Sequence, residues 1–241
     1  MRRGAGTGIM GGRKRTAGAG KGGSAMEWTV ERDYAREALP KRDPEGHKGT
    51  FGEVLALAGS VGYTGAAWLA AEGAVRGGCG LVHLGVPEDI WPVEAVKCTS
   101  AMPFPLAAED GGLSLRALEG IREKLARCDV LALGPGLGRR AETAELIRRL
   151  LSETEKPAVL DADGINALAG HIDILDRRRG RVTVLTPHEG EFARIGDLSG
   201  GRVRAARDFA VDHGCWLVLK GHRSLTATPW GTVLENATGN C

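Results

Sequence analysis

The sequence has few aromatic residues, little net charge and no long apolar segment. Phe, Trp and Tyr make up 5% of its 241 residues, and the formal net charge is +2. No apolar run approaches the ~18 residues that a membrane helix requires. Glycines follow Arg2 and Arg3 where a secretion signal would need apolar residues. With 42% apolar content, the length favours a globular chain that buries a full-sized core, and it excludes collagen-like, fibrous and wholly disordered proteins. We expect a chain that is neither membrane-inserted nor exported.

The cysteines lack the spacing of a metal site or of a disulfide framework. The five cysteines are odd in number, scattered and never spaced C-x-x-C; they are Cys79, Cys98, Cys128, Cys215 and Cys241. They therefore indicate neither a zinc site nor a set of disulfides, and a reducing cytoplasmic location is expected.

The amino-terminal segment 1–26 is basic and rich in glycine. It holds six basic residues, nine glycines and no acidic residue, which leaves 26 basic against 30 acidic residues in the remainder. This composition predicts a disordered arm, although contact with nucleic acid is an alternative reading. The GAGKGG stretch within it differs from a P-loop because Gly22, not Ser or Thr, follows Lys21.

Beyond a polar lead at 27–42, short apolar runs alternate with helix-period segments, which is typical of parallel strands joined by crossover helices. We expect an α/β fold with one domain over 43–241 and no internal repeat. The predicted strands are 53–58, 80–86, 129–133, 157–161, 182–186 and 215–219, followed by a hairpin of 224–228 and 232–235. The predicted helices are 65–76, 114–127, 140–151, 163–169, 188–195 and 202–213, the last closed by Gly214 as a left-handed C-cap.

Glycine is abundant, with 37 residues, about twice the usual share of ~7%, and it gathers where predicted strands end. In an open parallel sheet, ligands bind beyond the carboxyl ends of the strands. The loop Gly59–Gly65 follows the first strand with G-x-x-G-x-x-G spacing, and Ala66 opens a helix with a small first turn. Gly134–Gly138, with the sequence GPGLG, follows a later strand and exposes backbone to a phosphate or a flat ring. Turn formation alone is the competing reading of both loops.

Charged side chains follow the next three strands. Asp161 and Asp163 end one strand, where carboxylates could hold a metal-bound phosphate or orient a hydroxyl, although Asp163 is also a natural helix N-cap. His188 stands where the following helix begins and is a candidate substrate contact. The cations and hydroxyl of Lys220–Ser224 suit the neutralisation of phosphates.

Taken together, the motifs resemble the NAD(P)H-hydrate dehydratase family. The segments that carry the resemblance are HKGTFG at 47–52, GSVGYTGAAWLAA at 59–71, GPGLG at 134–138, LDADGINAL at 160–168, TPHEGEF at 186–192, LKGHRS at 219–224 and NATGN at 236–240. Seven ordered motifs across most of the chain make the resemblance specific.

The resemblance implies a ribokinase-like, three-layer α/β/α fold with a mostly parallel sheet. It implies a lyase that uses ADP or ATP, with Mg²⁺, to remove water from the S epimer of hydrated NADH or NADPH. Ala66, Gly136 and His188 match substrate contacts of the family. The nucleotide contacts match Lys220, Gly221, His222, Arg223 and Ser224, and Asp161, Asp163 and Asn166 are accessory candidates. A homo-oligomer is also expected, without a membrane or nucleic-acid partner.

The family's glycine-rich anion hole ends in a Gly-Asp pair that follows N-x-T-G-N, so the matching catalytic aspartate would lie beyond Cys241. We therefore expect marginal folding and weak dehydratase activity from the chain as given. The alternatives are a small-molecule kinase of the same superfamily, such as a vitamin or thiazole kinase, and a non-catalytic dinucleotide-binding module.

Overall fold

A computed structural model describes residues 14–15, 27–30 and 32–238. The expected arm over 1–26, including GAGKGG, lies outside the described residues except for Lys14 and Arg15, and the last residues of NATGN also lie outside them. No helix in the described part has the length and apolar character needed to cross a membrane.

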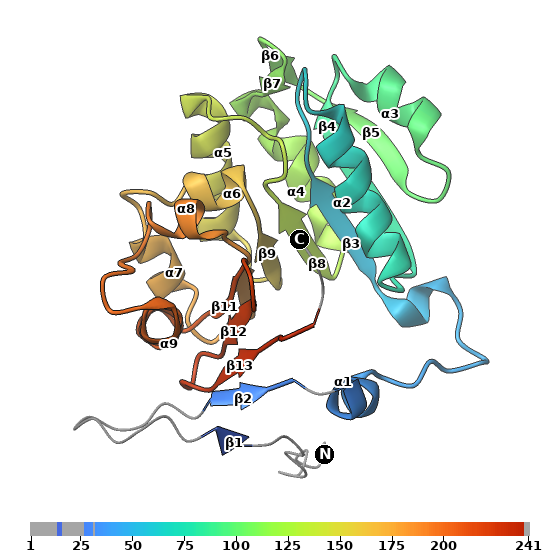
Figure 1. Cartoon of the computed structure of the whole chain (residues 1–241). Helices are drawn as coiled ribbons and strands as arrows, with labels where there is room; N and C mark the ends of the chain where they lie inside the picture. Colours follow the sequence, from blue (N-terminus) through green and yellow to red (C-terminus); the bar gives the residue numbers. More distant parts are fainter. Residues whose placement is uncertain (1–13, 16–26, 31, 239–241) are drawn as a thin grey trace.

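Helices and strands alternate along the described chain as the apolar pattern predicts (Figure 1). The strands are β1 (Lys14–Arg15), β2 (Glu27–Thr29), β3 (Glu53–Leu57), β4 (Leu81–Pro87), β5 (Met102–Leu106), β6 (Ala108–Glu109), β7 (Gly112–Leu113), β8 (Val130–Leu133), β9 (Ala158–Leu160), β10 (Thr183–Leu185), β11 (Trp216–Leu219), β12 (Leu225–Ala227) and β13 (Val233–Glu235). The helices are α1 (Arg32–Ala38), η1 (Lys48–Phe51), α2 (Thr64–Arg76), α3 (Trp91–Lys97), η2 (Leu115–Ala117), α4 (Leu118–Arg127), α5 (Ala141–Glu153), α6 (Asp163–Asn166), α7 (Asp173–Arg177), α8 (Glu189–Phe192) and α9 (Arg202–His213).

In the described part, eleven strands form one sheet in the order β1-β2-β13-β12-β11-β10-β9-β8-β3-β4-β5. The run from β11 to β5 is parallel throughout. The predicted hairpin is confirmed, because β12 pairs antiparallel with both β11 and β13. The carboxyl ends of β3, β8, β9, β10 and β11 therefore lie side by side along one edge.

Helices cover both faces of the sheet, which confirms the three-layer α/β/α expectation. Alternate residues of β3 and its C-terminal neighbour belong to two different cores: Leu55 and Leu57 to the core that also holds residues of α4, α5, α7 and α9, and Ala56 and Ala58 to the core that holds residues of α2. Figure 1 shows α2 and α3 at the β3–β5 end of the sheet. On the α2 side of the other strands, residues such as Val159 and Val184 are only half-buried, so this face is less completely covered than the opposite one.

Several predicted boundaries were wrong in detail. The segment 114–127 begins as the 3₁₀ turn η2 before α4 starts at Leu118. The predicted helix 163–169 ends as α6 at Asn166, because the chain continues in tight turns toward Gly170, whose φ is +77°. The predicted helix 188–195 is the shorter α8, for which His188 is the N-cap. Gly214 is confirmed as a left-handed C-cap of α9, with φ 62° and ψ 32°.

The sequence pattern missed α3 and β5 because both contain proline. Pro92 lies in the first turn of α3, where its missing N–H costs no helical hydrogen bond. Pro103 and Pro105 lie in β5, the last strand in the sheet order, which among the described residues pairs only with β4. An edge strand tolerates proline because one side of it needs no ladder hydrogen bond.

Candidate active site

The two glycine loops are docked against each other at the carboxyl edge. Gly59 N–H donates to the Pro135 carbonyl at 2.8 Å, and Ser60 Oγ donates to the Gly136 carbonyl at 2.7 Å. Gly136 has a φ of +67°, and a Cβ atom there would lie 2.8 Å from Ala66 Cβ and 2.9 Å from Tyr63 Cβ. Only glycine allows this approach without displacement. Two of the predicted substrate residues, Ala66 and Gly136, are thus brought together.

The side chain of Asp163 connects the GPGLG loop to α6 and does not cap that helix, as the alternative reading had it. Its Oδ2 accepts from Gly138 N–H at 2.9 Å, and its Oδ1 accepts from Asn166 Nδ2 at 3.0 Å. The N-cap of α6 is Ala162, without a side-chain cap. Arg194 Nη1 donates to Asn166 Oδ1 at 2.7 Å. Asp163 and Asn166 line a cavity of about 170 Å³ together with Gly138, Arg139 and Arg194.

Asp161 belongs to a separate cluster around Lys220. Lys220 Nζ donates to Asp161 Oδ1 at 2.6 Å and lies 3.8 Å from Glu191 Oε2. Thr186 Oγ1 donates to the same Asp161 oxygen at 2.8 Å. The ammonium group is therefore held between two carboxylates, yet the Lys220 side chain is still 41% exposed. Asp161 and Asp163, which the sequence offered as a pair, have different partners.

His188 combines a capping role with exposure to solvent. Its Nδ1 accepts from Gly190 N–H at 3.0 Å and Glu191 N–H at 3.2 Å. Because Nδ1 accepts, the proton of the neutral ring belongs on Nε2. Nε2 lies 3.4 Å from Glu191 Oε1, and the side chain is 56% exposed. His188 also forms a parallel bridge with Lys220, so the predicted substrate and nucleotide residues meet here.

The Lys220–Ser224 loop is held by charged neighbours that the sequence did not reveal. Arg202, the first residue of α9, donates to the His222 carbonyl at 2.9 Å and pairs with Glu189 at 2.8 Å. Arg223, with a φ of +58°, forms an ion pair with Glu235. Ser224 Oγ donates to the Gly221 carbonyl at 3.1 Å.

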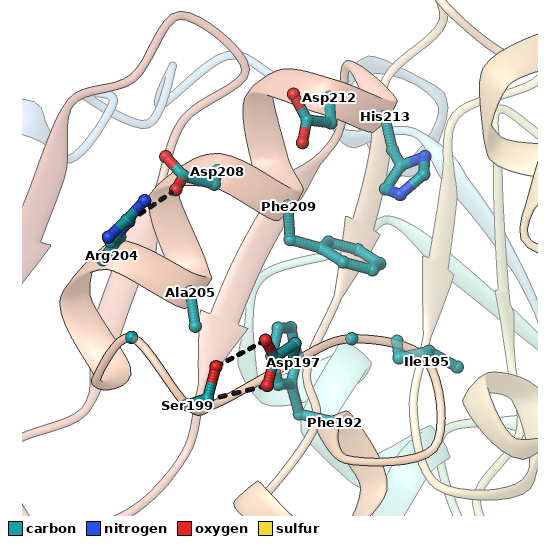
Figure 2. A pocket seen from close by; sticks show the side chains of 12 residues that line it. Phe192, Ile195, Asp197, Ser199, Arg204, Ala205, Asp208, Phe209, Asp212 and His213 are labelled. Carbon is teal, nitrogen blue, oxygen red and sulfur yellow. Dashed lines mark hydrogen bonds and ion pairs between the residues drawn. The ribbon is translucent and has the colours of Figure 1, made fainter.

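A second hollow, of about 410 Å³, lies between α8, α9 and the loop that joins them. Figure 2 shows Asp197 bonded to Ser199 and Arg204 bonded to Asp208 at its rim. None of the residues predicted for substrate, nucleotide or accessory roles lines it. It is therefore distinct from the crevice at the strand ends.

The fold is that of a ribokinase-like α/β protein, with glycine loops at the carboxyl edge of its sheet. A solved ribokinase-like protein of Enterococcus faecalis superposes with a TM-score of 0.75 at 20% identity, covering 89% of this chain and 72% of that one. The sequence profile of the NAD(P)H-hydrate dehydratases matches residues 54–241. The chain belongs to the NAD(P)H-hydrate dehydratase family.

Individual relatives agree with this assignment. The chain is 43% identical over 213 residues to a bifunctional NAD(P)H-hydrate repair enzyme of Moorella thermoacetica, covering 86% of this chain and 40% of the relative. It is 35% identical to an ADP-dependent (S)-NAD(P)H-hydrate dehydratase of Bacillus subtilis, covering 88% and 73%. A crystal structure of the ADP/ATP-dependent dehydratase from Bacillus subtilis, co-crystallised with ATP/Mg²⁺, superposes with a TM-score of 0.68 at 29% identity, covering 88% and 73%. The chain thus spans about two fifths of the bifunctional relatives it matches.

Proposed function

We propose that this chain carries the nucleotide-dependent dehydration of hydrated NADH or NADPH, specifically of the S epimer. The observation that carries the proposal is the junction of His188 with Lys220 at the same sheet edge where Gly136 meets Ala66. This junction supports the binding of two ligands side by side, with the damaged cofactor over the glycine loops and an adenine nucleotide at 220–224.

The substrate half of the crevice is small and polar. Ala66 and Gly136 present no long side chain, so the flat ring of a nicotinamide would approach the backbone closely. His188, whose Nε2 lies 3.4 Å from Glu191 Oε1, offers a hydrogen-bond donor at the same edge of the sheet. Asp163 keeps the GPGLG loop in position through the amide of Gly138. We propose that these features position the substrate, and we assign none of these five residues as the catalytic base.

The nucleotide half is centred on Lys220. Its ammonium group neutralises phosphate charge, and Asp161 and Glu191 fix its position. Arg223 within the loop and Arg202 beside it add two further cations, paired with Glu235 and Glu189. Preorganised cations of this kind stabilise the charge that develops during phosphoryl transfer.

The chemistry explains why a dehydratase would consume a nucleotide. Hydroxide is a poor leaving group at neutral pH, whereas phosphate leaves readily. Transfer of a phosphoryl group from ADP to the C6 hydroxyl gives AMP and a phosphate ester. The ring-nitrogen lone pair then expels phosphate and leaves an iminium cation, and loss of a proton from C5 to solvent restores the C5=C6 double bond. The sum is hydrated cofactor plus ADP giving reduced cofactor, AMP, inorganic phosphate and a proton.

The crevice fits a magnesium ion that is held partly by substrate. Mg²⁺ is usually bound by one or two carboxylates together with nucleotide phosphates. Asp161, whose side chain is 33% exposed, would supply one such carboxylate by exchanging its Lys220 partner, and no set of three potential metal ligands lies at this edge within the described residues. When bound, the ion would neutralise the phosphate charge.

The test measures binding and turnover separately. Equilibrium binding of ADP to the 241-residue chain is expected to weaken in Lys220→Ala, because the phosphates lose the positioned ammonium group. Lys156→Ala is the matched control, since Lys156 precedes β9 at the opposite edge of the sheet. Equal effects of both variants would refute the nucleotide site.

Turnover is followed by the near-ultraviolet absorbance of the dihydronicotinamide, with the S epimer as substrate. Recovery of absorbance with ADP or ATP, together with release of inorganic phosphate, supports the dehydratase. Release of a stable phosphorylated product would instead identify a kinase.

We also propose a homo-oligomer in a reducing compartment. Leu69 of α2 is 63% exposed, and Val93 and Val96 of α3 are 47% and 85% exposed, so neighbouring helices present apolar surface that suits self-association. Cys79, Cys98, Cys128 and Cys215 are free thiols, which supports the expected cytoplasmic location. Sedimentation velocity of the wild-type chain and of Val96→Asp tests the oligomer, and a monomeric wild-type chain would contradict it.

A further inference from the structure

The amino-terminal edge of the sheet, opposite the crevice, holds a cluster of three possible metal ligands. Glu53 is the first residue of β3, His83 is the third residue of β4, and Cys128 closes α4 just before β8. One ligand atom from each lies within 4.8 Å of the other two. Glu53 and His83 are 30 positions apart in the chain, and His83 and Cys128 are 45 apart, so no C-x-x-C or similar spacing could reveal the cluster.

Regular structure holds these side chains in place. β3 lies between β4 and β8 in the sheet. The backbone of Glu53 is fixed beside Cys128, because Glu53 N–H donates to Asp129 Oδ2 and Asp129 N–H donates to the Glu53 carbonyl, both at 2.8 Å. His83 Nε2 lies 3.2 Å from Glu53 Oε2. Ligands on rigid elements need little reorganisation to bind an ion.

The set of donor atoms matches a borderline divalent metal. Zinc binds thiolate sulfur, imidazole nitrogen and carboxylate oxygen, and its bond lengths and tetrahedral angles place ligand atoms about 3.5 Å apart. Closing the cluster from 4.8 Å to that separation requires movements of about 1 Å, which side-chain rotation supplies. One thiolate and one carboxylate also balance the charge of a divalent ion, which favours its binding in a half-buried site.

The cluster is partly accessible. Cys128 is fully buried, whereas the side chains of His83 and Glu53 are 15% and 28% exposed. Without metal, Cys128 Sγ donates to the Lys124 carbonyl at 3.4 Å. Burial, and secondarily the charge of Glu53, raise the pKa of this thiol, while Lys124 and Lys156 act in the opposite direction. Metal binding would displace the thiol proton to solvent, because only the thiolate is a zinc ligand.

We propose that Glu53, His83 and Cys128 form a zinc-class metal site that cross-links β3, β4 and the α4–β8 junction, with a water molecule as the fourth ligand. The site is independent of the proposed dehydratase function, because it lies at the other edge of the sheet. Its role is structural: a bound ion stabilises the folded chain over the unfolded chain by mass action.

The test titrates the metal-free full chain with Co²⁺ and then with Zn²⁺. Co²⁺ is expected to give a thiolate-to-cobalt charge-transfer absorption at one equivalent, and Zn²⁺ to abolish it and raise the melting temperature. Cys128→Ser is expected to lose the charge-transfer band. Cys215→Ser is the matched control, because Cys215 is also buried but precedes β11, and it should retain the band.

Glu53→Gln and His83→Gln, checked for folding by circular dichroism, are expected to bind Co²⁺ more weakly. An absence of stoichiometric metal in native mass spectrometry would overturn the proposal. So would a charge-transfer band that survives in Cys128→Ser.

Discussion

Replacing Gly136 by alanine tests whether the two glycine loops form one surface. The φ of +67° disfavours any residue with a Cβ atom, at a cost of about 1–2 kcal/mol. The new methyl group would also lie 2.8 Å from Ala66 Cβ and 2.9 Å from Tyr63 Cβ, and overpacking of this kind costs about 1–3 kcal/mol. We expect a total loss of about 2–5 kcal/mol in the free energy of unfolding, measured by urea denaturation.

Gly62→Ala separates backbone strain from steric overlap. Gly62 lies in the partner loop with a φ of +88°, but a Cβ atom there meets nothing within 4 Å. Its alanine variant should therefore cost only the strain, about 1–2 kcal/mol. Gly136→Ala should additionally weaken binding of the hydrated cofactor, because it pushes the loops apart.

A double variant identifies the contact itself. Adding Ala66→Gly to Gly136→Ala removes one of the two clashing methyl groups, so the double variant should be more stable than the sum of the single effects predicts. The Tyr63 contact remains, so recovery should be partial. Equal costs for Gly136→Ala and Gly62→Ala, with strictly additive effects, would refute the docked-loop arrangement.

Three further predictions concern stability. Arg178 is 1% exposed and donates to three backbone carbonyls and to Thr183 Oγ1, and burial lowers its pKa. Arg178→Met should lower the free energy of unfolding by about 3 kcal/mol or more in urea denaturation, because the buried acceptors lose their donors. The hydrogen bond from Arg207 lowers the pKa of Asp208 below its ordinary 3.8. The ionised Asp208 therefore makes a small contribution to the stability of the fold above pH 3.8, and this contribution is lost as the pH falls through the lower pKa of the folded state. Asp208→Asn should make stability depend less on pH in this range of the acid-denaturation curve, and an unchanged curve would contradict the pairing. Leu185 is fully buried whereas its neighbour Val184 is half-buried. Leu185→Ala should therefore lower the free energy of unfolding by about 2–5 kcal/mol, and Val184→Thr should lower it clearly less. Equal losses in denaturation would show that both faces of β10 are equally covered.

The apolar pattern predicted the central sheet well because its strands are buried on at least one face. Each predicted strand overlaps an observed one, since alternation of apolar runs with helical periodicity is a local property. Gly214 was predicted as a C-cap for the same local reason. The strand β5 was missed because Pro103 and Pro105 look like strand breakers, and only the sheet order reveals that β5 is an edge.

The candidate site was predictable as a set of loops but not as a network of partners. Because parallel strands end at one edge of the sheet, the sequence correctly placed the loops 59–65, 134–138 and 220–224 at the same edge. The sequence could not pair Asp161 with Lys220, because these residues are 59 positions apart and the pairing depends on sheet order. Arg202 carried no motif and was missed, and Asp163 contacts the distant amide of Gly138 in addition to its neighbour Asn166.

Hydrogen–deuterium exchange with saturating ADP, Mg²⁺ and hydrated NADH tests the central claim most directly. The account predicts slower exchange in peptides that cover 59–66, 134–138, 186–191 and 220–224, and no change at the amino-terminal edge around Glu53 and Asp129. Protection confined to the hollow between α8 and α9, with none at the strand ends, would contradict it.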